Sequence, residues 1–394
     1  MYPNLYFAFK DLFNVDWGFL RFVNSFGFFV ALSFVGAAVT LSKELQRKER
    51  EGILVSEEEK IIVGKPATGG ELFLNFIIGF LLGYKLIGLF ISSGEVDPRQ
   101  YIFSVQGNLI AGLAGGLFFA GLKWWEKNKT KLPQPEERTI RIWPHDRVGD
   151  LTIFAAIFGF LGAKIFDILE SPSDFIQSLK ELHRGTQDFG SLIFSGLTFY
   201  GGLICAALAI WYYAKKHHIG FWQLNDAAAP GLMLAYAIGR IGCQVSGDGD
   251  WGIDNVHAKP FSWLPNWMWS YQYPHNVISK GINIPGCFDQ QYCNQLPVGV
   301  FPTPFYETVV CLILFFILWS FRKKFTVPGT LFAFYLIVNG VERFFIEKIR
   351  VNVQYNIFGF HPTQAEIISF LLVVLGTVLW IVLKRRSKKL EIRN

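Results

Sequence analysis

The chain is poor in charge for its length. Of its 394 residues only 17% are Asp, Glu, Lys or Arg, whereas soluble globular proteins carry about 25%. Hydrophobic residues make up 51% of the chain, phenylalanine occurs 40 times, and the mean hydropathy is +0.31. This composition excludes an ordinary soluble domain. It indicates a polytopic membrane protein, for which domains cannot be counted from length alone.

Two further features are lacking: a signal-peptide pattern and a metal-ligand cluster. Residues 1–17 contain no charged region followed by a small-residue cleavage site, so we expect no cleavable signal peptide. The sequence has no metal-ligand cluster, so we expect neither a metal nor another cofactor. The formal charge of +6 comes from basic residues beside apolar runs, which indicates membrane topology rather than binding to nucleic acid.

Cysteine is also scarce, with five in the chain. Cys205 and Cys311 lie inside apolar runs, and we interpret them as packing residues. Cys287 and Cys293 lie in a long polar loop and could form a disulfide if that loop faces an oxidising compartment. Spacing alone does not fix the pairing, so both states stay open.

Apolar runs long enough to cross a bilayer core of ~30 Å recur along the chain. They predict an all-α fold, a polytopic transmembrane helical bundle of about nine spans. The predicted spans are 18–41, 70–94, 107–125, 148–170, 191–214, 223–242, 304–322, 328–347 and 363–384. Lys and Arg gather in alternate loops and in the tail, so the positive-inside rule predicts an N-terminus outside and a cytoplasmic C-terminus. The long loop 243–303 is then periplasmic.

One pair of helices is duplicated in the sequence. The run LGYKL at 82–86 recurs as LGAKI at 161–165, and GGL at 115–117 recurs at 201–203. The second copy keeps more polar residues, so we place function there and interpret the first copy as structural. This predicts an N-terminal region, 1–145, which holds the first span and an extra helix pair, and a functional core, 146–394.

The most informative stretch is GRIGCQVSGDGDWG at 239–252. Arg240 stands at the end of a predicted span, and the glycines and aspartates after it show no hydrophobic period, which predicts irregular backbone. Within a membrane, irregular backbone is tolerated only where it lines an enclosed or watery cavity. An arginine there needs an anion, and the abundant anion of a membrane is lipid phosphate. The stretch therefore predicts a site for a phospholipid headgroup.

The eighth predicted span carries Asn339, Arg343 and Glu347 on one helical face. A charged residue inside a span costs about 2.5–3.5 kcal/mol on insertion scales. One alternative is an ion pair near the membrane surface; the other, which we favour, is an inward polar stripe in which Glu347 holds Arg343 against an anion. For Glu307 and Glu366, each near the start of a helix, a charge complementing the helix dipole is as good an interpretation as a functional role.

These residues resemble a known family. GRIG at 239–242, SGD at 246–248, WG at 251–252 and TFYGGL at 198–203, together with Arg343 and Glu347, resemble motifs of the prolipoprotein diacylglyceryl transferases. The resemblance runs from about residue 146 to the C-terminus. The sequence departs from the family pattern at several polar positions: Cys243 stands for Asn, Tyr200 for His, Phe26 for Tyr and Asn339 for Tyr.

The resemblance implies an enzyme of the bacterial cytoplasmic (inner) membrane. It would transfer a diacylglyceryl group from phosphatidylglycerol to the lipobox cysteine of a prolipoprotein signal peptide. The expected catalytic residues are Arg240, Arg343, Tyr200 and Glu347. The expected substrate-binding residues are Arg240, Gly242, Cys243, Ser246, Asp248, Asp250, Gly252, Asn339 and Glu307. The alternative is a membrane transporter or a lipid-binding paralogue without transferase activity, which would use the same intramembrane charges as a substrate path.

Overall fold

The structure, a computed structural model, describes residues 1–91, 101, 106–185, 189–194, 196–287, 292–352, 355–356 and 360–391. These residues are mostly helical, as the sequence predicts. The chain forms two compact units. The first unit combines Met1–Leu54 with Ile219–Asn394, and the second is Val55–His218. This division reflects which residues lie close together in space, because the first unit combines segments from both ends of the chain. The functional division at 145/146 stays a prediction.

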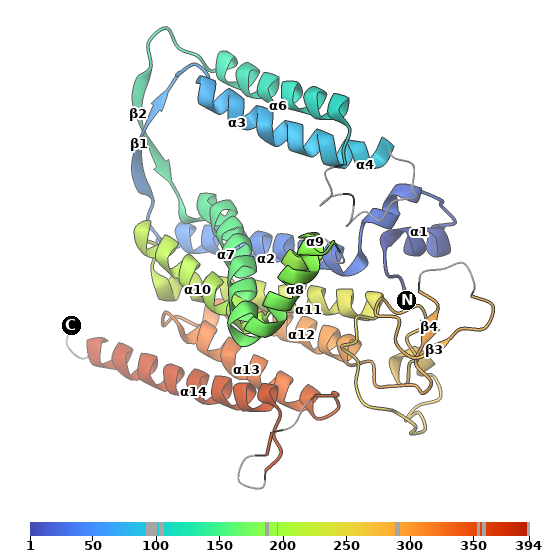
Figure 1. Ribbon diagram of the computed structural model, residues 1–394. Coiled ribbons are helices and arrows are strands. Elements are labelled where there is room, and N and C mark those ends of the chain that lie inside the picture. Colours follow the sequence, from blue (N-terminus) through green and yellow to red (C-terminus); the bar gives the residue numbers. More distant parts are fainter. Residues whose placement is uncertain are drawn as a thin grey trace. The chain divides into compact units, whose positions relative to one another are not determined.

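The first unit is a bundle of long helices around α11. Its helices are α1 (Leu5–Phe13), α2 (Ser25–Arg50), α11 (Phe221–Ser246), α12 (Thr303–Phe321), α13 (Thr330–Glu347) and α14 (Gln364–Glu391) (Figure 1). Helix α11 packs against α2, α12 and α13, and α14 packs along α13. Between α11 and α12 lies a loop that contains a short ribbon of β3 (Ile282–Asn283) and β4 (Asn294–Gln295).

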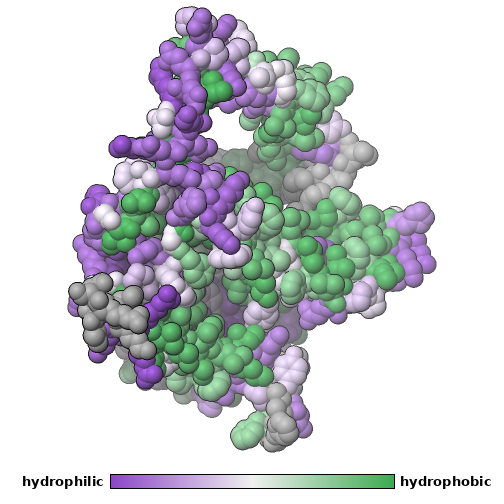
Figure 2. Space-filling model, turned by 90° about the vertical axis from the view of Figure 1, so that its left-hand side faces the viewer, coloured by the Kyte–Doolittle hydropathy of each residue, from purple (hydrophilic) through white to green (hydrophobic). Residues whose placement is uncertain are grey.

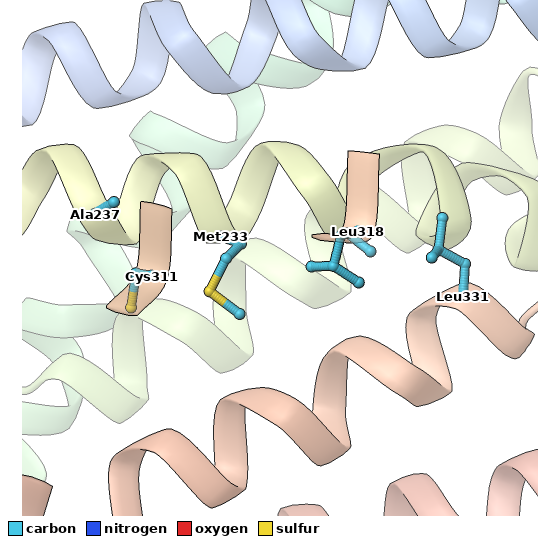
Figure 3. Packing of buried hydrophobic residues seen from close by; sticks show 6 residues of the cluster. Met233, Ala237, Cys311, Leu318 and Leu331 are labelled. Atoms are coloured by element: carbon cyan, nitrogen blue, oxygen red, sulfur yellow. The ribbon is translucent and has the colours of Figure 1, made fainter. Parts of the chain in front are cut away.

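The centre of this bundle is a fully apolar contact between three helices. Met233 and Ala237 of α11 meet Cys311 and Leu318 of α12 and Leu331 of α13, and all five are buried (Figure 3). Cys311 is thus a packing residue, as expected. The contact fixes the relative position of the three helices that carry the charged residues described below.

Polar caps fix where the helices of this unit begin. The backbone N–H groups of Gly329 and Phe332 donate to the buried carboxylate of Asp226, at 2.7 and 2.8 Å, which ties the start of α13 to α11. Pro304 lies in the first turn of α12, where a missing N–H costs nothing. The side chains of Thr363 and Glu366 cap each other's backbone at the start of α14. The helix starts expected near Glu307 and Glu366 are therefore confirmed.

The second unit holds two helical hairpins joined by a β-ribbon. Strands β1 (Glu57–Val63) and β2 (Glu136–Ile142) pair antiparallel with Glu57 opposite Ile142. One hairpin is α3 (Gly69–Leu82), extended by the π-helix η2 (Gly83–Ile87) and α4 (Gly88–Ile91), with α6 (Leu109–Lys129). The other is α7 (Val148–Glu170) with α10 (Phe199–Lys216), and it also carries α8 (Pro172–His183) and α9 (Phe189–Phe194).

Glycines lie where the two helices of each hairpin come close together. A Cβ atom on Gly115 of α6 would lie 2.4 Å from the carbonyl oxygen of Gly79 on α3. A Cβ atom on Gly201 of α10 would lie 2.5 Å from the carbonyl oxygen of Gly162 on α7. Only glycine permits such close backbone approach. The duplication of this helix pair stays a prediction.

Several helices present apolar side chains outward. By length and composition, five of the described helices could cross a membrane: Ser25–Arg50, Gly69–Ile87, Pro144–Glu170, Thr303–Lys324 and Gln364–Lys388. Figure 2 shows the apolar residues, in green, over much of the helix surface. The other four predicted spans fall on α6, α10, α11 and α13, which are helices too. Residues 92–94 and 195 of the predicted spans lie outside the described residues.

Several predicted boundaries differ from the helix ends; the span predicted from residue 191, for example, covers the end of α9 and α10, which begins at Phe199. The first span was predicted from residue 18, but Gly18–Phe22 is a 3-10 helix and α2 begins at Ser25, where the Asn24 side chain caps it. The span predicted to end at residue 242 continues as α11 to Ser246. The helix ends there because Gly247 adopts a left-handed conformation, with φ of 66°. The first half of the 239–252 stretch is therefore helical, and irregular backbone starts only at Gly247.

The loop after α11 contains a disulfide between Cys287 and Cys293. Of the two states that the sequence left open, free cysteines or a disulfide, the structure shows the disulfide. The same loop buries Trp251, Tyr273, Leu296 and Val300 against one another. These contacts give the loop a small core of its own.

Candidate functional site

Two arginines from different helices meet at one buried carboxylate. Glu307, in the second turn of α12, has a side chain with 0% exposure. Arg343 of α13 donates from Nη1 to Glu307 Oε1 at 2.7 Å. Arg240 of α11 brings its Nε to 3.2 Å from Glu307 Oε2. Because the three helices pack on one another, residues far apart in the sequence form a single ionic centre.

A third arginine, Arg350, completes this centre just after α13. Its Nη2 donates to Asp250 Oδ1 at 2.7 Å, and its Nη1 lies 3.7 Å from Glu307 Oε2. Asp250 also accepts a hydrogen bond from Nη1 of Arg240. The carboxylates of Asp250 and Glu307 therefore each bridge Arg240 and Arg350.

The predicted pair of Arg343 and Glu347 is present and buried. Arg343 Nη2 lies 3.2 Å from Glu347 Oε2, and the Glu347 side chain also accepts a hydrogen bond from Asn352. The Glu347 side chain has 0% exposure, which disfavours a surface ion pair. Glu366, by contrast, caps α14 and pairs with Lys348. Of the two glutamates left open by the sequence, Glu307 joins the ionic centre and Glu366 is structural.

The charges of this centre balance. Three guanidinium groups face three carboxylates, and most of these side chains are removed from water. Asp250 is the most exposed member, at 38% of its side chain. Burial acts to raise the pKa of Asp250, but the positive charges of Arg240 and Arg350 outweigh it and lower that pKa. For Asp248, which has no such pair of arginines, burial raises the pKa.

A glycine places Arg350. The backbone of Gly252 forms a bridge with Arg350, and its N–H donates to the Phe301 carbonyl at 2.9 Å. A Cβ atom on Gly252 would lie 2.4 Å from the carbonyl oxygen of Ile349. Only glycine fits between these two strands of backbone. Gly242 has a similar but milder role, because a Cβ atom there would lie 3.0 Å from Cβ of Phe29 on α2.

The remaining predicted residues of the 239–252 stretch surround Arg240. Cys243 Sγ lies 3.8 Å from Arg240 Nη1, and Asp248 Oδ1 accepts from the backbone N–H of Asp250 at 3.2 Å. Ser246 is fully buried at the end of α11. Cys243, Asp248 and Asp250 place one ligand atom each within 4.8 Å of one another, a grouping that could hold a metal ion. Because Asp250 is already engaged by two guanidinium groups, we interpret the grouping as part of the ionic centre.

Two predicted residues lie away from these contacts. Asn339 is half-buried on α13, one turn before Arg343. Tyr200 lies in the first turn of α10, in the second unit. Its role at the arginine centre stays a prediction.

Sequence reasoning missed Arg350 and Tyr236. Tyr236 of α11 donates its hydroxyl to Glu307 Oε1 at 2.8 Å. The available signal for Tyr236 was its position one turn before Arg240. For Arg350 there was no local signal, because it lies beyond the end of α13 and is placed by the pairing of its backbone with Gly252.

Comparison with known proteins gives a family match over most of the chain. The model of a family described as prolipoprotein diacylglyceryl transferase matches residues 109–382. This range begins earlier than the predicted resemblance and includes α6. A protein of Bifidobacterium adolescentis named phosphatidylglycerol–prolipoprotein diacylglyceryl transferase is 29% identical over 252 residues, 63% of this chain and 69% of that protein. A protein of the same name from Geobacillus kaustophilus is 29% identical over 251 residues, 62% of this chain and 79% of its own length.

Proposed function

The chain belongs to the prolipoprotein diacylglyceryl transferase family, and from this premise we propose how its buried charges carry out the transfer. The protein is a membrane transferase of lipoprotein biosynthesis. It moves a diacylglyceryl group from phosphatidylglycerol to the lipobox cysteine of a prolipoprotein, and glycerol phosphate leaves. The family match favours this function over the transporter or lipid-binding alternative.

The reaction needs positive charge at the leaving group. The cysteine sulfur forms a bond to a glycerol carbon while the bond from that carbon to a phosphate oxygen breaks, and the departing phosphate gains negative charge. Guanidinium groups fixed in a poorly solvated site stabilise such charge and can bind two phosphate oxygens each. We assign this role to Arg240 and Arg343. The observation that carries the assignment is that both side chains converge on one buried carboxylate, Glu307.

The incoming phosphate has to compete with a carboxylate, because the ionic centre is already neutral. Asp250 is the best candidate for displacement, since it is the most exposed of the three carboxylates. It lies beside Gly249, whose φ is +103°, in the loop that follows α11. The Nε and Nη1 atoms of Arg350 are buried and have no hydrogen-bond partner among the described residues. These donors would be available to a phosphate that takes the place of Asp250.

The other predicted residues receive supporting roles. Glu347 orients Arg343, and Gly252 holds the backbone that places Arg350. For Tyr200 we keep only the hydrogen-bonding role that the family resemblance implies. The residues proposed to shape the substrate site around Arg240 are Gly242, Cys243, Ser246, Asp248, Asp250, Glu307 and Asn339. No step in this scheme is assigned to a metal ion or a cofactor.

The topology is also proposed. We propose nine spans in the inner membrane, with the N-terminus outside and the C-terminus in the cytoplasm. This topology would place the loop 243–303 in the periplasm. The disulfide between Cys287 and Cys293 supports this placement, because disulfides persist in oxidising compartments. The site would then face the same side as the signal peptide of a translocated prolipoprotein. Residues 146–394 would form the functional core.

Complementation tests the function. The intact gene, introduced into a bacterial strain depleted of its own transferase, is expected to restore growth and the mass increase of a reporter lipoprotein. Arg240→Ala and Arg343→Ala variants that insert normally are expected to fail. Failure of the intact, membrane-inserted protein would refute the proposed function.

A further inference from the structure

A fourth carboxylate lies beside the ionic centre and has no hydrogen-bond partner in the part of the chain that the structure describes. Glu342, on α13 immediately before Arg343, is 6% exposed. Neither of its carboxylate oxygens has a hydrogen-bond partner among the described residues, and both are inaccessible to water. No described basic side chain forms an ion pair with it either. The mechanism above makes no use of this group.

Positively charged side chains lie near Glu342, but they already form ion pairs with other carboxylates. Glu342 interacts electrostatically with titratable and charged groups from three helices and the segment after α13. These groups are Tyr236 and Arg240 of α11, Glu307 and Cys311 of α12, Tyr335 and Arg343 of α13, and Arg350. Because the three arginines are paired with Glu307, Asp250 and Glu347, an ionised Glu342 would give the centre an excess negative charge. An ionised carboxylate without hydrogen bonds in a buried site is very costly. The neutral acid is the form that this site accommodates.

The transfer has to move one proton. The substrate thiol loses a proton when the carbon–sulfur bond forms. The phosphate oxygen gains an electron pair when the bond between carbon and oxygen breaks. The histidine that the family resemblance implied is replaced by Tyr200, a weak acid and a weak base at neutral pH. The reaction therefore needs another group that exchanges protons.

We propose that Glu342 is the group that carries this proton. It rests as the neutral acid, donates its proton to the departing phosphate oxygen, and recovers a proton from the thiol. The proton of the thiol thus ends on glycerol phosphate, which leaves as a monoanion. The phosphodiester that enters carries one negative charge and the phosphate that leaves carries one, so the charge of the site is the same before and after the transfer. This inference rests on the proposed function.

The test is a kinetic comparison of Glu342→Gln with the intact protein. The assay follows transfer from phosphatidylglycerol in mixed micelles to a lipobox peptide. Glutamine keeps the shape and the hydrogen-bonding capacity of a neutral acid but does not exchange a proton. We expect kcat to fall by about 10²–10⁴-fold, the usual contribution of a proton-transfer group, with KM for phosphatidylglycerol unchanged within about twofold. Glu342→Asp should recover part of the lost kcat.

Stability separates this role from a structural one. Replacing an unpaired buried carboxyl removes no hydrogen bond, so the thermal unfolding midpoint of Glu342→Gln should equal or exceed that of the intact protein. Glu126→Gln, an exposed position on α6, is the matched control and should leave kcat and stability unchanged. Loss of activity together with a lower unfolding midpoint would overturn the inference in favour of a structural role.

The kinetic outcomes distinguish the two levels of the proposal. If the intact protein transfers the diacylglyceryl group and Glu342→Gln does so at a kcat within about twofold, the inference fails and the proposed function stands. A loss confined to KM would also overturn the inference, because it would make Glu342 a binding residue. An intact protein that inserts and folds but shows no transfer would overturn the proposed function and this inference with it.

Discussion

Glu307→Gln is the variant that most sharply tests how the ionic centre is built. The substitution keeps the size of the side chain but removes the charge that bridges Arg240, Arg343 and, at longer range, Arg350. Breaking a buried ion pair by removing one partner typically costs about 3–5 kcal/mol, because the remaining charge stays buried without compensation. We expect Glu307→Gln to destabilise the protein by about this amount.

Glu44 offers a matched control elsewhere in the same unit. Its side chain is 1% exposed and bridges two arginines, with Arg47 Nε at 3.0 Å and Arg322 Nε at 2.9 Å. Glu44→Gln should therefore destabilise the protein by a similar amount. It should not affect chemistry, because Glu44 belongs to a separate ionic cluster between α2 and the end of α12.

The assay combines thermal unfolding in detergent with the rate of transfer per folded molecule. Both variants should unfold at lower temperature than the intact protein, and only Glu307→Gln should lose transfer at a temperature where both remain folded. Equal transfer by the two folded variants would show that Glu307 is only a structural bridge. That result would refute the functional interpretation of the centre.

Three other predictions follow from contacts at the end of α11 and in the loop after it. Gly252→Ala should abolish transfer, because the added Cβ atom would lie 2.4 Å from a carbonyl oxygen. Gly239→Ala is the control and should leave transfer intact, because no atom lies within 4 Å of its Cβ position. The rate of transfer by each variant tests this prediction. Cys243→Ser should retain most activity, since the acceptor thiol belongs to the substrate, and complete loss with normal insertion would contradict this. Asp250 has a lowered pKa, so its contribution to stability is fully present above the ordinary value of 3.8 and is lost as the pH falls from there towards the lowered pKa. The stability difference between the intact protein and Asp250→Asn should therefore be constant from pH 6 to pH 8, and a steep change in that range, measured by unfolding, would refute the assignment.

The helices could be predicted from the sequence because apolar runs of about 20 residues have few other structures available. Helix ends were less predictable. The run from Arg240 to Ser246 was predicted to be irregular beyond residue 242, yet α11 includes all of it. Its residues tolerate a helix, and the true stop signal was Gly247, which takes a left-handed conformation. The ribbon of β1 and β2 was missed because its strands are rich in charge and were interpreted as loops.

The candidate site was only partly predictable, because its contacts join distant segments. The spacing of Arg343 and Glu347 along one helix predicted their pairing correctly. Nothing local to Glu307 distinguished a buried bridge from a helix-terminal charge, and that difference depends on how α12 packs between α11 and α13. Arg350 lies beyond the end of α13, where it enters the centre only because Gly252 pairs with its backbone.

The most direct test of the central claim measures how tightly the arginines bind the phosphate that is displaced. Glycerol phosphate should inhibit transfer by the intact protein competitively with the lipid headgroup. Arg240→Lys and Arg343→Lys should each raise its inhibition constant by about 10–150-fold, which corresponds to the loss of a charge-assisted hydrogen bond worth about 1.5–3 kcal/mol. Folded lysine variants that bind glycerol phosphate as tightly as the intact protein would contradict the account.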